Sequence, residues 1–116
     1  MDKLRKYDLH DAIISSLDFY TTLRGKKWLN FNININIVMV LYDGTKINIL
    51  FYHVKNYKIK IGNKNQYFLE IERYKYKKVD NIEKYDFKIQ GGNIDIESKT
   101  VKLKVFMNEN NKKVNI

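Results

Sequence analysis

The chain has 116 residues and no cysteine, and its 22 Lys and Arg against 13 Asp and Glu give a formal net charge of +9 at pH 7. The length fits one domain spanning residues 1–116, and we expect the polar segment 107–116 to fray as a tail. The lack of cysteine excludes disulfides, thiolate metal sites and cysteine nucleophiles. The positive charge favours anionic partners, which are nucleic acid, acidic proteins or membrane surfaces.

Hydrophobic patterning indicates a soluble cytoplasmic protein. The longest stretch without a charged residue, 28–42, is interrupted by four Asn and cannot span a bilayer, so no membrane partner is expected. The first ten residues, MDKLRKYDLH, carry charges where a secretory signal needs an apolar run. Only three of the 22 cations are Arg, although recognition of bases and phosphates favours the guanidinium fork. Drift of an AT-rich genome is therefore a second explanation of the charge.

The first predicted element follows the stretch DLHDAIISSLDFY at 8–20. His10 and Asp11 precede an apolar run, which predicts a turn that begins a β-strand, with Asp11 accepting hydrogen bonds from backbone amides of the turn. The apolar residues from Ile13 onward also fit helical spacing. A short helix within residues 3–17, capped by Asp11, is the alternative.

Alternation with period two is clearest between residues 28 and 54, where it predicts a long hairpin around Asp43 and Gly44. A three-residue loop with Gly44 in the left-handed region would pair Met39 with Ile47 and keep apolar residues on one face. The opposite face of the first strand carries a row of asparagines, for which we weigh a partner-binding or edge-protecting face against repetitive AT-rich coding: Asn30, Asn32, Asn34 and Asn36.

The pattern predicts a second hairpin that pairs 57–61 with 67–71 across a loop at 62–65. Beyond this hairpin the apolar phase slips by one residue, which predicts a bulge or bend around Glu72 and Arg73.

A further strand through 85–89 precedes a turn at Gly91 and Gly92, and a final hairpin is expected around Ser98 and Lys99. The fold class is therefore all-β. We predict an antiparallel meander of about seven or eight strands that forms a sandwich, a strongly curved sheet or a partly open barrel, with at most one short N-terminal helix.

Side chains that could carry chemistry are few. His10 and Asp11 could belong to a metal site or act as a general base, but His53 is the only other imidazole and the spacing does not bring it to them. The acids Glu70 and Glu72 could act on a sugar, although a solvated strand face explains both. We therefore expect no catalytic residue, no metal site and no cofactor, and interpret His10, Asp11 and His53 as residues that contact a partner.

Aromatic and cationic residues alternate in the stretch ERYKYKK, where Arg73, Tyr74, Tyr76 and Lys77 are the strongest candidates for partner binding. Such a Tyr/Lys band could stack bases and hold the phosphates of single-stranded nucleic acid. Strand tyrosines are also common packing residues, and the acids nearby dilute the charge.

The sequence as a whole resembles small β-rich proteins of low-GC Gram-positive bacteria, some of which look like immunity proteins of polymorphic toxin systems. The likeness spans residues 8–106 and rests on the motif LHDA at residues 9–12, the turn at Asp43 and Gly44, the motif FYHV at 51–54 and the strand FLEIERY. It implies a cytoplasmic protein that neutralises a partner toxin by binding it, and it supplies no catalytic residues.

We therefore predict a non-enzymatic protein-binding domain that is immunity-like. A basic module that binds single-stranded nucleic acid or another anion is the alternative, and a metal-dependent enzyme acting through His10 and Asp11 is the third reading. The charge of +9 also makes a nuclease target less favourable, because a phosphate-binding cleft is itself basic.

Overall fold

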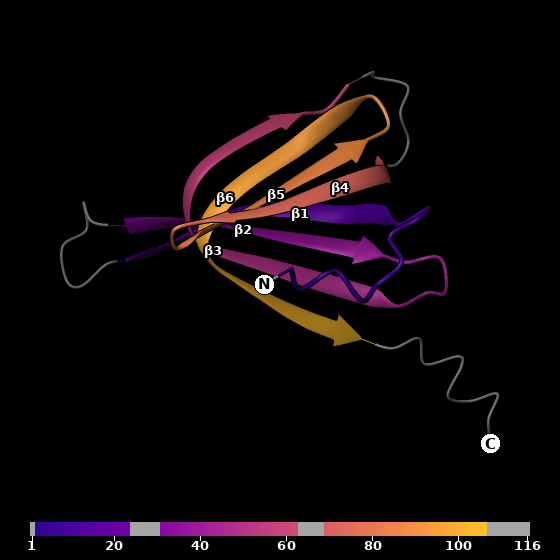
Figure 1. Cartoon of the computed structure of the whole chain (residues 1–116), viewed down its shortest axis with the longest axis horizontal. Helices are drawn as coiled ribbons and strands as arrows, with labels where there is room; N and C mark the ends of the chain where they lie inside the picture. The colour runs from indigo at the N-terminus through magenta and orange to yellow at the C-terminus, as the bar shows by residue number, and fades with distance from the viewer. Residues whose placement is uncertain (1, 24–30, 63–68, 107–116) are drawn as a thin grey trace.

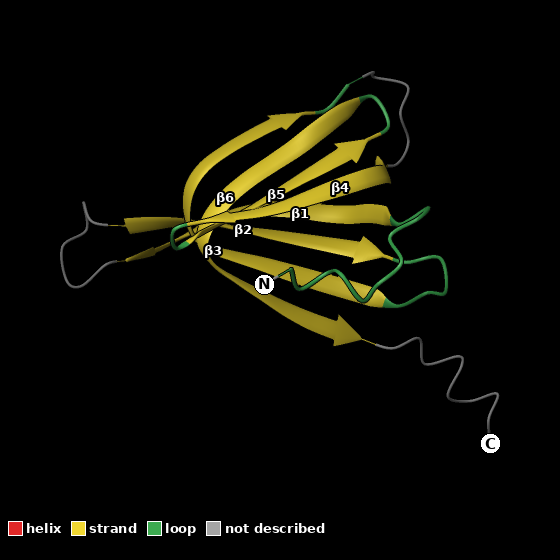
Figure 2. Ribbon diagram, in the orientation of Figure 1, coloured by secondary structure: helices red, strands yellow, loops and turns green. Residues whose placement is uncertain are grey.

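The computed structural model describes residues 2–23, 31–62 and 69–106, which form six β-strands and contain no helix (Figures 1 and 2). The prediction of an all-β antiparallel protein is confirmed, and the residues before Ile13 form turns. The tail 107–116 lies outside the described residues. The strands are β1 (Ile13–Leu23), β2 (Phe31–Val40), β3 (Lys46–Lys60), β4 (Leu69–Val79), β5 (Ile82–Ile89) and β6 (Gly92–Phe106).

All six strands belong to one antiparallel sheet in the order β1-β2-β3-β6-β5-β4, and a contact between β4 and β1 closes the sheet into a ring. This closure has only two residue pairs, Ile13 with Glu70 and Ile14 with Leu69, whereas β3 and β6 pair along nearly their whole length. Figure 1 accordingly shows strands that converge at one end of the molecule and splay at the other, unlike the staves of a regular barrel.

Two local predictions are confirmed. The Leu41 N–H donates to the Thr45 carbonyl (N···O 2.8 Å), Gly44 has a φ of 89°, and Met39 pairs with Ile47, as the three-residue loop requires. Glycine adopts this left-handed conformation without the steric cost that a Cβ would add. In β4 the register with β5 shifts just after Ile71, where the slip in the apolar phase predicted a bulge.

The long strands β3 and β6 bend at mid-length and serve two halves of the ring. The first part of β3 pairs with both β2 and β6, and its last part pairs with β6 alone. Backbone geometry marks the bend at His53, whose φ is 55°. The inward-facing phase of β6 changes at the same level, because Ile96 and Ser98 are buried on one side of the bend and Val101 on the other.

This bend overturns one predicted turn and one predicted strand pairing. The loop predicted at 62–65 lies largely outside the described residues. No turn separates Ser98 from Lys99, since β6 runs continuously through both. The predicted pairing of 57–61 with 67–71 is also wrong, because Tyr57 and Ile59 pair with residues of β6. A hairpin and a bent strand both reverse the apolar phase, so the sequence pattern alone does not distinguish them. The strand count consequently falls from seven or eight to six in the described part of the chain.

The residues that precede β1 fill the wide mouth of the ring. Leu4 and Ala12 are completely buried, Leu9 nearly so, and all three belong to the same core as the inward-facing side chains of the strands. We call residues 2–12 the N-terminal segment. In Figure 1 it crosses the splayed end of the molecule before entering β1. Beneath the segment lies a group of buried aromatic rings, in which Tyr85 contacts Phe51 and Phe87.

The burial of Leu4 generates a stability prediction. Leu4→Ala should lower the free energy of unfolding by about 2–4 kcal/mol, because it removes buried methyl groups and leaves a cavity under the N-terminal segment. Urea unfolding measures the change, and Arg5→Ala, at an exposed neighbour, is the control with an effect within about 0.5 kcal/mol. Equal losses in the two variants would show that the segment does not belong to the core.

Candidate functional site

His10 and Asp11 lie in an exposed turn immediately before β1, as predicted, but Asp11 is not the acceptor that the sequence suggested. The His10 N–H donates instead to Oδ1 of Asp8 (2.9 Å), and Asp11 adopts a φ of 61°. The His10 Nε2 atom lies 3.3 Å from Asp11 Oδ2. A hydrogen bond with Asp11 raises the pKa of Glu70 on β4. These residues thus form a local polar contact where β4 meets β1.

The two histidines lie at different levels of the ring. His53 is exposed at the bend of β3, and its N–H donates to Oδ1 of Asn34 (3.1 Å). Asn34 lies six residues along β2 from Val40, the residue that pairs with Ile13 beside the His10 turn, a separation of about 20 Å at ~3.3 Å per residue. Among the described residues, no group of three or more His, Cys, Asp or Glu side chains is placed to hold a metal ion.

The asparagine row does not all face water as predicted. Asn34 is completely buried, and its amide nitrogen donates to the Thr22 hydroxyl of β1 (3.1 Å) while its oxygen accepts from His53. This side chain thereby ties β1, β2 and the bend of β3 together. Asn30 lies outside the described residues.

The Tyr/Lys band divides between the two faces of β4. Tyr74 and Tyr76 turn inward and pack around Tyr85, with ring centroids 6.5 Å and 4.9 Å from it. Arg73 and Lys77 are exposed. Both rings are partly buried against the core, so only part of each is accessible to a base.

The hydroxyls of these inward tyrosines donate hydrogen bonds to carboxylates. Asp2 accepts hydrogen bonds from Tyr74 (3.0 Å) and Tyr85 (3.2 Å), and Glu83 accepts one from Tyr76 (2.9 Å). Burial and the bond to Asp2 raise the pKa of Tyr74 to about 12, and burial raises the pKa of Tyr76 to about 12 as well. Asp2 thus anchors the N-terminal segment to the inner face of β4 and β5.

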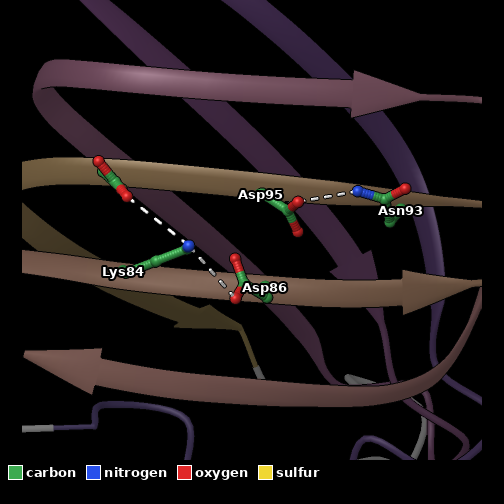
Figure 3. Close-up of polar contacts among 5 residues, drawn as sticks. Lys84, Asp86, Asn93 and Asp95 are labelled. Carbon is green, nitrogen blue, oxygen red and sulfur yellow. Dashed lines mark hydrogen bonds and ion pairs between the residues drawn. The ribbon is translucent and has the colours of Figure 1, made fainter.

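The outer face of β5 and β6 carries a polar cluster (Figure 3). Asp86 and Asp95 are directly paired across the two strands, while Lys84 Nζ lies 3.9 Å from Asp86 and 3.7 Å from Glu97. Asn93 donates to Asp95 (2.9 Å). Burial and then the charge of Asp95 raise the pKa of Asp86, because a second negative charge beside the Asp95 carboxylate is unfavourable.

Lysines border this acidic pair on both sides. Lys75 of β4 pairs with Asp86, and Lys58 of β3 pairs with Asp95, so the row across four strands runs basic, acidic, acidic, basic. The charges of this row compensate one another. The next row, Arg73, Lys88, Asn93 and Lys60, carries three cations and no acid.

A groove with unbalanced charge lies between the N-terminal segment and the last part of β6. It has a volume of about 970 Å³. Leu103 is half-buried against the core and Val105 is 36% exposed, so they supply apolar surface in the groove. Four cations and one acid line it, and the carboxylate of that acid, Asp2, already accepts from two tyrosines. The lining residues are Asp2, Lys3, Arg5, Lys6, Tyr7, Lys102, Leu103 and Val105.

Sequence reasoning missed this groove. Arg5 and Lys6 lie in a segment that was interpreted as a charged terminus, and Lys102 and Leu103 were assigned to one arm of a final hairpin. The available signal was the apolar pair Leu4 and Leu9, which a purely exposed terminus does not need.

Comparisons with known proteins give no match: no family model matches the chain, and neither a curated protein nor a solved structure is significantly similar to it. The resemblance to immunity-like proteins therefore stays a prediction. In the described part of the chain, no helix is long and apolar enough to cross a membrane.

The environment of Tyr74 predicts a loss of stability at alkaline pH. Because the folded pKa of about 12 exceeds the unfolded value of about 10, the folded state favours the neutral phenol. Its contribution should be complete below pH ~10 and should disappear as the pH rises through ~12. Urea unfolding across this range should show a smaller decline in Tyr74→Phe than in the wild type. Tyr42→Phe, at a residue 86% exposed, is the control that should keep the wild-type decline.

The paired acids Asp86 and Asp95 give a second pH prediction. Because its pKa is raised on folding, Asp86 opposes stability once the pH exceeds the unfolded value of about 4. Asp86→Asn should therefore raise the melting temperature at neutral pH, and the gain should vanish below pH ~4. Asp18→Asn, at an exposed site on β1, is the matched control. A lower melting temperature for Asp86→Asn at neutral pH would mean that its ion pair with Lys84 outweighs the repulsion from Asp95.

Proposed function

We propose that this chain is a non-enzymatic protein-binding domain that recognises an acidic region of a partner protein through the groove beside β6. In this role it would act as an immunity-like protein does, by occupying the working surface of a partner. The single observation that carries the proposal is the groove itself, where an excess of cations surrounds apolar surface.

The charges of the groove support an acidic partner. Arg5, Lys6 and Lys102 are exposed around its opening, and Lys6 and Lys102 lie over the rings of Tyr7 and Tyr52 at 5.3 Å and 5.6 Å. Cations held over aromatic faces keep their charge available to a ligand while losing some freedom of movement. An approaching anionic surface would therefore be steered to this mouth of the ring.

The apolar surface favours a protein over nucleic acid. Leu103 and Val105 would contact aliphatic side chains of a protein. Single strands would stack on aromatic rings, and the rings of Tyr7 and Tyr52 already have a lysine over them. The tyrosines of β4 are partly buried against the core, and their hydroxyls donate to acids. Nucleic acid remains the alternative that the experiment below tests directly.

A charge-reversal experiment tests the proposal. The probes are a fluorescent octapeptide of alternating Glu and Val and a single-stranded oligonucleotide, both measured by fluorescence anisotropy at several salt concentrations. The triple variant Arg5→Glu, Lys6→Glu, Lys102→Glu should bind the peptide more weakly than the wild type, by a factor of about ten or more. The control Lys75→Glu, Lys77→Glu, Lys78→Glu has the same net charge but changes exposed residues of β4.

Equal weakening by the two triple variants would show that net charge and not the groove determines binding. Tighter binding of the oligonucleotide than of the peptide by the wild type, with a steep dependence on salt, would replace the proposal by the nucleic-acid alternative.

A further inference from the structure

The hydrogen bonding of the β2–β3 hairpin fixes which way each backbone group of β3 points. The Leu41 N–H donates to the Thr45 carbonyl, so these two residues form a hydrogen-bonded pair. Such pairs recur at every second residue of an antiparallel ladder, which makes Met39 with Ile47 the next one. The intervening residue Asn48 must then direct its N–H and carbonyl away from β2 and toward β6.

The alternating direction of the backbone groups continues into β6. Asn48 pairs with Lys104, so the backbone groups of Lys104 and of Lys102, two residues before it, point to β3. Those of Val101, Leu103 and Val105 point to the opposite side. An independent contact agrees, since the Val101 carbonyl accepts a hydrogen bond from Lys3 Nζ of the N-terminal segment.

No described strand pairs with this opposite side. The register of β5 with β6 extends from Gly92 only to Ser98, because Ser98 pairs with Glu83, the second residue of β5. In the described part of the chain, Leu103 and Val105 therefore present backbone donors and acceptors along an open strand edge that borders the groove. An open edge of this kind is a template for pairing with another chain.

The two faces of this edge differ in chemistry. Leu103 and Val105 project toward the groove, and the alternate residues Lys102 and Lys104 are exposed. A strand added to this edge would place successive side chains alternately toward the apolar surface and toward the lysines.

We propose that the open edge of β6 at residues 101–105 accepts an extended segment of the partner protein as an added strand, in which apolar and acidic residues alternate. The inference rests on the proposed function and specifies how the acidic partner binds. Main-chain hydrogen bonds to Leu103 and Val105 supply the pairing, and the lysines select acidic residues on the outer face.

The charge of the edge distinguishes this occupant from a second copy of the chain. Two β6 edges that met would bring Lys102 and Lys104 of both copies together, and like charges across strands destabilise pairing. An acidic strand meets the same lysines with favourable charge. The edge therefore discourages self-association and favours a partner of opposite sign.

N-methylation of the peptide tests strand addition without changing the protein. Two versions of the Glu-Val octapeptide carry N-methyl groups, one on the Val residues and the other on the Glu residues. Each version loses the N–H donors along one of the two edges of the extended peptide, while the two versions keep equal charge and composition. One version should bind the wild-type chain at least tenfold more weakly than the unmethylated peptide, and the other should bind about as tightly as it does. Loss with methyl-Val indicates an antiparallel strand, and loss with methyl-Glu a parallel one.

Hydrogen exchange locates the contact. On addition of the unmethylated peptide, the amides of Leu103 and Val105 should exchange more slowly, and those of Lys102 and Lys104, already directed toward β3, should not change.

Strand addition is overturned if the two methylated peptides bind equally, whether well or poorly. It is also overturned if sedimentation shows that the chain alone is a dimer with Leu103 and Val105 already protected. Binding of both methylated peptides with sensitivity to Arg5, Lys6 and Lys102 would leave the proposed function standing while removing this inference.

Discussion

The bend that β3 and β6 share is the constraint on which the rest of the structure depends. It allows two 15-residue strands to serve both halves of the ring, and Asn34 fixes it by accepting the N–H of His53. β5 begins at Ile82 and pairs with β6 only as far as Ser98, so one edge of β6 is open beyond the bend. The open edge and the wide mouth therefore lie in the same half of the ring.

An open mouth would expose the core, and the N-terminal segment covers it. Leu4 and Leu9 complete the core, while Asp2 accepts hydrogen bonds from the hydroxyls of Tyr74 and Tyr85. The segment reaches β6 through Lys3, which leaves Arg5 and Lys6 along the groove. The groove is therefore a consequence of how the chain closes its own core, and its cations are positioned by apolar residues that alternate with them.

The sequence predicted what depends on neighbouring residues and missed what depends on distant ones. Alternation and the glycine at 44 determine the β2–β3 hairpin locally, so its register followed from arithmetic. A phase slip at Ser98 fits either a turn or a bend, and only the pairing of β6 with β3, more than 40 residues away in the chain, decides between them. In the Tyr/Lys band, Arg73 and Lys77 are exposed, as a partner contact needs. Tyr74 and Tyr76 are partly buried against the core, and their hydroxyls donate to Asp2 and Glu83, which lie elsewhere in the chain.

The net charge of +9 acquires a more specific meaning from its distribution. On the outer face of the sheet, Lys58 and Lys75 flank Asp95 and Asp86, so the charge of that one row is compensated. At the open edge Lys102 and Lys104 have no acids beside them on β6, and a strand edge is the place where uncompensated lysine is most useful. Lysine at this edge has two effects that genomic drift alone does not require. The same two side chains would repel a copy of this chain and attract a strand of opposite charge.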